Sequence, residues 1–285
     1  MQKVLITGSE GFIGKRLQSF LRSEQDCEVW TLDTEDSTGN HFACPVQDFD
    51  RFDEFDTIYH LAAVTDRSLS KSKLWDVNVE GTRNVCKHVG GGQKVVFTSS
   101  AYIYNQDKKG VKKEGEREEP ENYYGLTKLI SEKLISYFAR ENGFEYSLFR
   151  LFFVYGPSQP EGFLIPDLVS RAATEDLEVN QPQSYLSLAY IEDVIEILTD
   201  SQVQGGPFNI CEGCYSMETI YDTVARLMGV DVEVADEASA NRTYLCGDNT
   251  KISDYKESWT ALEEGVAEVI LKKTNNPFKD NERVA

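Results

Sequence analysis

Short apolar runs alternate with longer amphipathic stretches along the first half of the chain. The short runs are typical of strands buried on both faces of a sheet, and apolar positions that repeat every three to four residues indicate helices packed against it. The predicted strands are residues 3–6, 28–32, 41–44, 56–63, 94–99 and 146–153, and the predicted helices are residues 12–21, 74–89 and 123–142. This alternation predicts an α/β fold class, a Rossmann-type doubly wound parallel sheet.

A stretch punctuated by proline and glycine, residues 156–162, marks a change of organisation. We expect residues 1–155 to form the Rossmann domain and residues 156–273 to form a small C-terminal substrate lobe. Residues 186–200 are expected to pack back onto the first domain, and residues 274–285 to form a disordered tail. In the lobe the pattern predicts helices at 164–174, 192–199 and 217–228 and strands near 177–179, 186–188 and 208–210.

The turn after the first predicted strand carries Gly8, Gly11 and Gly14, and Phe12 and Ile13 open the helix that follows. Gly8 permits the tight turn, Gly11 lets a phosphate approach the backbone, and Gly14 lets the helix pack close to the strand. Free N–H groups and the helix dipole favour an anion at this point. The glycines alone are equally compatible with an ordinary turn, but the strand–turn–helix context favours a dinucleotide site.

The second predicted strand ends at Asp33, close to the roughly 20-residue offset expected of a carboxylate that binds the adenosine ribose. Asp33 would accept hydrogen bonds from a ribose 2′-hydroxyl and would repel a 2′-phosphate. No arginine or lysine lies between Trp30 and Pro45 to hold such a phosphate. The sequence therefore predicts NAD as cofactor, rather than NADP.

Charge and cysteine usage limit the partners and the compartment. The net charge of −19 argues against nucleic acid and anionic membranes as partners, and no run of 18 apolar residues could span a membrane. We expect a cytoplasmic protein whose six cysteines are reduced thiols. Cys211 and Cys214 form one CxxC, which we interpret as ordinary free thiols in a loop, and no metal site is predicted.

Three residues are candidates for catalysis. Tyr124 and Lys128 lie one helical turn apart, and Ser100 follows a predicted strand, at the edge where parallel sheets bind ligands. A free phenol titrates near pH ~10, and a neighbouring ammonium or an oxidised nicotinamide would lower that pKa. A surface Tyr/Lys pair is the simpler interpretation of those two residues alone. Together with the glycine turn, the three indicate a hydride-transfer site.

The chain resembles the extended short-chain dehydrogenase/reductase family, in its NAD-dependent epimerase/dehydratase branch with the nucleotide-sugar 4-epimerases. The resemblance covers residue 3 to about residue 270 and rests on the glycine turn, Asp33 and residues 48–49, 60–63, 78–82, 99–104, 124–128, 150 and 154–157. It implies that Ser100, Tyr124 and Lys128 match the catalytic triad, and that Tyr124 and Lys128 also contact the coenzyme.

The same resemblance implies further coenzyme contacts. Asp48 and Phe49 would flank the adenine, and Leu61, Ala62 and Ala63 would line the coenzyme. His60, which precedes these three residues in the strand predicted at 56–63, would be structural rather than catalytic.

The chain departs from the family pattern at the substrate side. The acidic pair of the 4,6-dehydratases is Ala101 and Tyr102 here, which argues against dehydration and leaves an epimerase or a keto-reductase. The usual Asn and Arg that contact the diphosphate of a sugar nucleotide are Phe153 and Leu186. These replacements put the substrate in doubt and leave the redox chemistry intact.

We expect an NAD-dependent epimerase that acts on a sugar nucleotide by hydride transfer through a 4-keto-type intermediate. The alternatives are a reductase of a non-nucleotide carbonyl and a non-catalytic NAD-binding regulator. Phe153 and Arg242 are the candidate substrate-binding residues, with Arg242 as the cation for the diphosphate; a surface cation is an equally good interpretation of Arg242. By the resemblance, the helices at 74–89 and 123–142 imply a homodimer.

Overall fold

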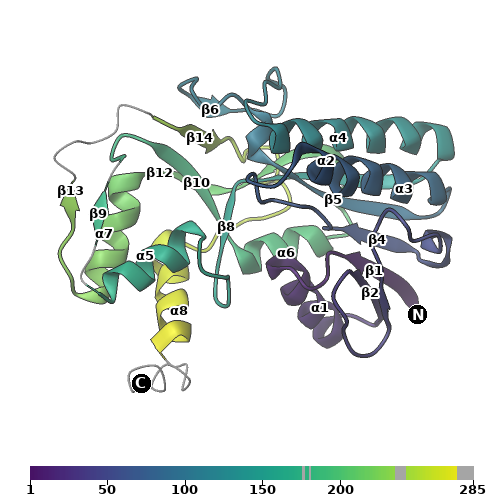
Figure 1. Ribbon diagram of the computed structural model, residues 1–285, viewed down its shortest axis with the longest axis horizontal. Coiled ribbons are helices and arrows are strands. Elements are labelled where there is room, and N and C mark those ends of the chain that lie inside the picture. Colours follow the sequence, from purple (N-terminus) through teal and green to yellow (C-terminus); the bar gives the residue numbers. More distant parts are fainter. Residues whose placement is uncertain (175–176, 180, 235–241, 275–285) are drawn as a thin grey trace.

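A computed structural model describes residues 1–285 except 175–176, 180, 235–241 and 275–285. The predicted tail therefore lies outside the described residues, apart from Thr274. Seven parallel strands form the main sheet in the order β11-β7-β5-β4-β1-β2-β3 (Figure 1). They are β1 Gln2–Thr7, β2 Cys27–Asp33, β3 His41–Ala43, β4 Thr57–His60, β5 Lys94–Ser100, β7 Glu145–Leu151 and β11 Gly205–Ile210. The predicted α/β doubly wound sheet is confirmed.

Helices cover both faces of this sheet, because successive strand residues point to opposite faces. Helices α1 (Phe12–Glu24) and α6 (Ile191–Thr199) lie together on one face, and α3 (Gly81–His88) and α4 (Tyr123–Asn142) lie on the other (Figure 1). Within β1, Val4 and Ile6 belong to the core shared with α1 and α6, whereas Leu5 belongs to the core shared with α3 and α4. The apolar runs read from the sequence thus supply two cores.

The helix predicted at residues 74–89 has different bounds in the structure. It consists of α2 (Lys71–Leu74), a π-helical segment (Trp75–Glu80) and α3. The carbonyl of Asn78, inside the π-helical segment, accepts hydrogen bonds from the hydroxyls of Thr82 (2.6 Å) and Ser131 (2.8 Å). The irregular segment is therefore held by side-chain contacts to α4, which apolar spacing alone does not show.

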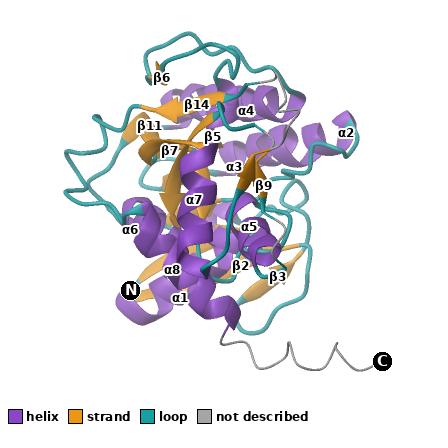
Figure 2. Ribbon diagram, turned by 90° about the vertical axis from the view of Figure 1, so that its left-hand side faces the viewer, coloured by secondary structure: helices purple, strands orange, loops and turns teal. Residues whose placement is uncertain are grey.

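A second sheet and three helices form the C-terminal lobe. The sheet has the order β12-β10-β14-β6, and β8 also pairs with β10. Its strands are β6 Val111–Lys112, β8 Phe153–Tyr155, β10 Tyr185–Tyr190, β12 Glu212–Ser216 and β14 Tyr244–Gly247. Figure 2 views the molecule from the lobe side, with its helices in front. They are α5 Leu164–Ala172, α7 Met217–Met228 and α8 Leu262–Thr274, beside the short pair β9 Glu178–Val179 and β13 Glu233–Val234.

Several local predictions about this part of the chain differ from the structure. The strand predicted at residues 146–153 ends at Leu151, and the chain then enters the second sheet as β8. The segment at 106–121, for which the apolar pattern predicts no strand, contributes β6 and buries Lys112. Helix α8 carries no sequence prediction, although Val266 and Val269 are buried. In each case the pairing is with a segment distant in sequence.

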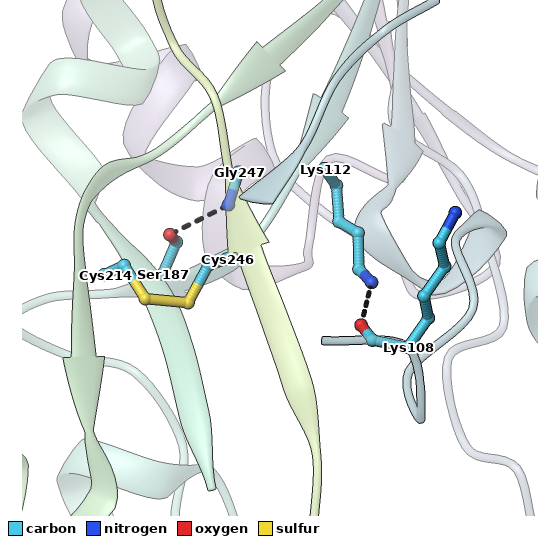
Figure 3. Close-up of a disulfide and its surroundings, with 6 residues drawn as sticks. All are labelled: Lys108, Lys112, Ser187, Cys214, Cys246 and Gly247. Carbon is cyan, nitrogen blue, oxygen red and sulfur yellow. Dashed lines mark hydrogen bonds between the residues drawn. A yellow bond between two sulfur atoms is a disulfide. The ribbon is translucent and has the colours of Figure 1, made fainter. Parts of the chain in front are cut away.

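The cysteine prediction is wrong at two positions. Cys214 of β12 and Cys246 of β14 form a disulfide with a Cα–Cα distance of 5.2 Å, beside Ser187 of β10 (Figure 3). The four remaining cysteines, Cys211 among them, are free thiols. The pairing joins residues 32 apart in sequence, and only the assembled second sheet brings them together. Such a bond is at odds with the reducing compartment expected from the sequence.

The two parts of the molecule are joined through the buried side chain of Arg150, which is 1% exposed. Its guanidinium donates to both carboxylate oxygens of Glu132 on α4, at 3.0 and 2.8 Å, and to the Tyr104 hydroxyl at 2.9 Å. The Tyr104 hydroxyl in turn donates to Asn209 of β11 at 2.8 Å, and the Asn209 amide donates to the carbonyl of Lys112 at 2.9 Å. One buried charge thus organises α4, the β6 segment and β11.

No helix among the described residues is long and apolar enough to cross a membrane.

Candidate active site at the carboxyl edge of the sheet

The glycine turn forms an open cradle at the end of β1. Gly8 has a φ of +71°, and a Cβ on it would lie 2.7 Å from the Ala62 backbone. A Cβ on Gly14 would lie 2.3 Å from the Gly8 carbonyl oxygen. Gly11 is exposed and meets only that same oxygen, at 3.3 Å. Gly8 and Gly14 are thus required by the fold, and the exposed Gly11 leaves the approach to the helix N-terminus open, as a pyrophosphate needs.

Asp33 lies beside this turn, at the end of β2. One carboxylate oxygen accepts the Glu10 N–H at 2.9 Å, and the other accepts the Thr34 N–H at 2.7 Å. Each carboxylate oxygen can accept a further hydrogen bond. The side chain is half-buried beside the glycine turn. A ribose diol next to a bound pyrophosphate could therefore donate hydrogen bonds to its carboxylate. These residues fit a dinucleotide with a free 2′-hydroxyl.

The remaining coenzyme candidates line the same edge. Leu61, Ala62 and Ala63 follow β4 and are half-buried, and the Ala62 N–H donates to the Thr7 hydroxyl at 3.2 Å. Asp48 is exposed, whereas the Phe49 ring is buried between the rings of Phe42 and Phe52, each 4.8 Å away. Phe12 and Ile13, in the first turn of α1, are half-buried.

His60 lies beneath this row of residues, fully buried. Its Nδ1 is 2.8 Å from the Thr7 hydroxyl and its Nε2 is 2.9 Å from the Thr82 hydroxyl. Burial lowers the pKa of His60 to about 3, so the ring stays neutral. Both ring nitrogens are used to connect β1, β4 and α3, which agrees with a structural role.

Ser100 and Tyr124 meet where β5 ends and α4 begins. The Ser100 hydroxyl accepts the Tyr102 N–H at 3.2 Å, capping a 3₁₀ turn (Ala101–Ile103), and it lies close enough to the Tyr124 phenol to lower its pKa. Asn122 caps α4 by accepting the Gly125 N–H at 2.8 Å, which fixes Tyr124 in the first turn. Burial raises the pKa of the Tyr124 phenol to about 12, against the lowering effects of Ser100 and Arg67.

Lys128 lies one turn further along α4, with its ammonium buried. Nζ donates to the Thr98 carbonyl of β5 at 2.8 Å and lies 4.7 Å from the centre of the Phe97 ring. Burial lowers the pKa of Lys128 to about 7, and Glu132 opposes that shift. The expected lowering of the Tyr124 pKa by Lys128 is not found; the cation that acts on the phenol is Arg67.

Two residues that position Tyr124 escaped the sequence analysis. A Cβ on Gly125 would lie 2.1 Å from the Tyr102 carbonyl oxygen, so this glycine allows α4 to approach the 3₁₀ turn. Asn78 donates to the Thr127 hydroxyl at 3.0 Å and accepts the Val64 N–H at 2.8 Å, tying the loop after β4 to α4. The only sequence signal was their place inside stretches used for the family resemblance.

Aromatic side chains form the substrate side of the cluster. The Tyr102 ring lies 6.1 Å from the Tyr124 ring and 6.1 Å from the Phe153 ring, edge to face in both cases. The Arg67 guanidinium stands over the outer face of Tyr102 at 5.0 Å. Leu186, at the usual arginine position, is buried in the core. Phe153 thus belongs to an apolar wall next to the catalytic phenol.

We compare Arg242 with Arg171 as cations of the lobe that could bind a diphosphate. Arg242 is exposed and precedes β14, and the segment just before it lies outside the described residues. Arg171 on α5 has its guanidinium over the Tyr221 ring and donates to the Glu178 carbonyl at 3.2 Å. Arg242 is therefore the more accessible of the two.

The sequence matches the model of the NAD dependent epimerase/dehydratase family over residues 4–211. The chain belongs to this family. The predicted family is thereby confirmed, and with it NAD as the cofactor.

Among curated relatives, GDP-6-deoxy-D-talose 4-dehydrogenase of Aggregatibacter actinomycetemcomitans is 27% identical over 81% of this chain and 82% of its own length. UDP-glucose 4-epimerase of Lactobacillus helveticus is 25% identical over 94% of both. Among solved structures, MoeE5 in complex with UDP-glucuronic acid and NAD superimposes with a TM-score of 0.82 at 24% identity, over 95% of this chain and 99% of that one. The structural likeness supports the fold, and the relatives' names cover more than one reaction.

Proposed function

We propose that the protein is an NAD-dependent epimerase of a nucleotide sugar. The observation that carries the proposal is the placement of Ser100, at the carboxyl edge of β5, beside the Tyr124 phenol, with the buried Lys128 one helical turn further along α4. The names of curated relatives, which include a UDP-glucose 4-epimerase and a GDP-sugar dehydrogenase, support the class of substrate.

The side chains divide the work of oxidising a secondary alcohol. NAD, when bound, supplies the hydride acceptor and later the hydride donor. Tyr124 takes the proton from the substrate hydroxyl as general base, and Ser100 donates a hydrogen bond to the same oxygen. The carbon would be inverted when hydride adds to the opposite face of the ketone carbon, and the Tyr124 phenol would return the proton to the ketone oxygen. Lys128, held on the Thr98 carbonyl, can contact the nicotinamide ribose and keep its position.

Dehydration is disfavoured by the residues next to Ser100. Loss of water beside the ketone needs an acid to protonate the leaving hydroxyl, and the residues after Ser100 are Ala101, which is buried, and Tyr102, whose ring packs on Tyr124 and Phe153. Neither supplies a carboxylic acid. The keto intermediate would therefore be reduced rather than dehydrated.

The substrate's diphosphate needs a cation, because a buried unpaired charge is costly. We propose Arg242 for this contact and Phe153 for the wall of the sugar site. The family resemblance implies a late arginine near the position of Arg242, whereas Leu186, at the other usual arginine position, has a buried side chain. The lobe from residue 156 onward would close over the nicotinamide end of the coenzyme.

Incubation of the purified protein with NAD and a panel of UDP-, dTDP- and GDP-hexoses tests the proposal. We expect one nucleotide series to raise the melting temperature in the presence of NAD, and a sugar of that series to be converted to its epimer, as detected by NMR or chromatography. Turnover of a non-nucleotide carbonyl, with no stabilisation by any nucleotide sugar, would contradict the proposal.

We further propose that the protein is a homodimer, assembled through α3 and α4. Leu126 and Tyr137 on α4 are 37% and 51% exposed, although both are apolar enough to favour burial. Pairing of α3 and α4 with their copies would cover them. Light scattering at micromolar concentration should give twice the chain mass of 32.2 kDa, and Tyr137→Glu should give single chains. A wild-type monomer would contradict the proposal.

A further inference from the structure

Arg67 lies in the loop between β4 and α2, at the mouth of the catalytic cluster. Its guanidinium carbon is 5.0 Å from the centre of the Tyr102 ring, and that ring lies 6.1 Å from the ring of Tyr124. Arg67 is exposed, so its N–H donors face solvent on the side where a substrate must enter. The loop that carries it is fixed at its start by Asn78, which binds both polar atoms of the Val64 backbone.

Among the described residues, Arg67 has no carboxylate within ion-pair distance, although the chain has a net charge of −19. The neighbouring Asp66 is occupied by the N–H and the hydroxyl of Ser68, at 2.8 and 2.7 Å. Ion pairs with Asp or Glu are formed by Arg16, Arg51, Arg83, Arg117, Arg150 and Arg226. Arg67 instead rests on an aromatic ring and keeps its hydrogen-bonding capacity for another anion.

The surroundings of Arg67 indicate where that anion would be. The guanidinium lies on the Tyr102 ring, which is next to Tyr124, and its charge lowers the pKa of the Tyr124 phenol. An anion near the reacting oxygen would therefore also be near Arg67. The walls of this space are the rings of Tyr102 and Phe153, which offer an anion no charged hydrogen-bond donor. A negatively charged group of the substrate near Tyr124 would therefore have Arg67 as its partner.

We propose that Arg67 binds a carboxylate on the sugar ring, and that the preferred substrate is a nucleotide-linked uronic acid rather than the neutral hexose. This inference rests on the proposed function. Tyr124 acts on a ring hydroxyl, so groups within reach of both Tyr124 and Arg67 are substituents of the same ring, and the diphosphate is attached at the opposite end of the sugar. Guanidinium and carboxylate match as a planar, two-bond pair, and the aromatic platform holds the guanidinium in position.

Steady-state kinetics with UDP-glucuronic acid and UDP-glucose, at saturating NAD, would test this assignment. We expect wild type to have a lower KM for the uronic acid by about 10-fold or more, because hydrogen bonds between charged groups are the strong ones. Arg67→Ala should raise the KM for the uronic acid by about the same factor and change that for UDP-glucose less than about 3-fold. Arg67→Lys should keep part of the preference, since it keeps the charge but loses the two-bond geometry.

Arg117→Ala is the matched control, because it removes an exposed arginine charge whose partner is Glu119. It should leave both KM values unchanged. Thermal shift with each nucleotide sugar, with NAD present, gives a second readout that does not depend on turnover. Wild type should be stabilised more by the uronic acid, and Arg67→Ala should be stabilised equally by both.

Two results would overturn the assignment. One is equal affinity of wild type for the two sugars. The other is an equal loss for both sugars in Arg67→Ala, which would mean that Arg67 only supports the Tyr102 ring. In either case UDP-glucose would still bind and turn over, so the proposed function would stand. If no nucleotide sugar binds at all, the proposed function fails together with this inference.

Discussion

The coenzyme side and the substrate side of the candidate site are built in different ways. On the coenzyme side, backbone packing sets the shape: Gly8 and Gly14 have no room for a Cβ, and Asp33 is fixed by two N–H donors. On the substrate side, the proposed contacts come from individual side chains: Phe153, whose ring packs on Tyr102, and the exposed Arg242. The first construction tolerates little change. The second can change its ligand by single substitutions while the fold stays the same.

The largest effect is expected at the junction of the two sides, from Tyr124→Phe. Removing the hydroxyl removes the proposed general base beside Ser100, while the ring keeps its contact with Tyr102. Turnover of the nucleotide sugar should fall by about 10²–10⁴-fold, the range typical of general acid–base catalysis. NAD affinity, measured by titration, should stay near the wild-type value.

Tyr123→Phe is the matched control, since it removes a phenol from the neighbouring half-buried residue. Its turnover should be close to wild type. A Tyr124→Phe variant with a near-wild-type rate would exclude Tyr124 from the chemistry. The assignment of the coenzyme side would then stand, and the assignment of the catalytic residues would not.

The next largest effect is expected at the buried Arg150, which joins the two parts of the molecule. Glu132→Ala leaves the guanidinium of Arg150 buried without its main partner, and breaking a buried ion pair in this way costs about 3 kcal/mol or more of unfolding free energy. Urea denaturation should show this loss. Glu54→Ala removes an exposed partner of Arg51 and should cost less than about 1 kcal/mol. Similar losses in both variants would mean that Arg150 does not join the two parts.

The sequence predicts most of the coenzyme side, because its signals are local. The spacing of Gly8, Gly11 and Gly14 within one strand–turn–helix unit determines the turn, and the end of the next strand gives Asp33. The spacing of Tyr124 and Lys128 along one helix does the same for α4. Each of these depends on neighbours within the same unit of secondary structure.

The substrate side depends on contacts between distant segments, so periodicity could not predict it. The contact of Arg67 with Tyr102 joins two loops, and the Cys214–Cys246 disulfide joins two strands of the second sheet. The turn of the chain from β7 into β8 depends on pairing with β10. The sequence shows that Phe153 and Leu186 depart from the family pattern, but not what surrounds them.

A smaller effect is expected at the coenzyme side from Asp33→Asn. The variant loses the charge that strengthens hydrogen bonds from the ribose hydroxyls, so NAD should bind about 10- to 100-fold more weakly. NADP should gain relative to NAD, because the repulsion of its phosphate is removed. Asp36→Asn, which removes an equal charge from the exposed segment after β2, should leave both affinities unchanged. Equal affinities of wild type for NAD and NADP would contradict the assignment of Asp33.

The smallest effect is expected on the substrate side, from Arg242→Ala. An exposed guanidinium that meets a diphosphate is partly screened by water, so its contribution resembles that of a surface ion pair, about 1 kcal/mol or less. That corresponds to a rise in the KM for the nucleotide sugar of about 2- to 5-fold, with kcat unchanged because the contact is equal in ground and transition state.

Arg140→Ala on α4 is an exposed control at the far end of the helix from Tyr124 and should have no effect. A large fall in kcat for Arg242→Ala would show that Arg242 acts in the transition state and not only in substrate binding. An unchanged KM would mean that the diphosphate has another partner. If the substrate side is formed by single side chains rather than by the backbone, Arg242→Ala should therefore change KM modestly and leave kcat unchanged.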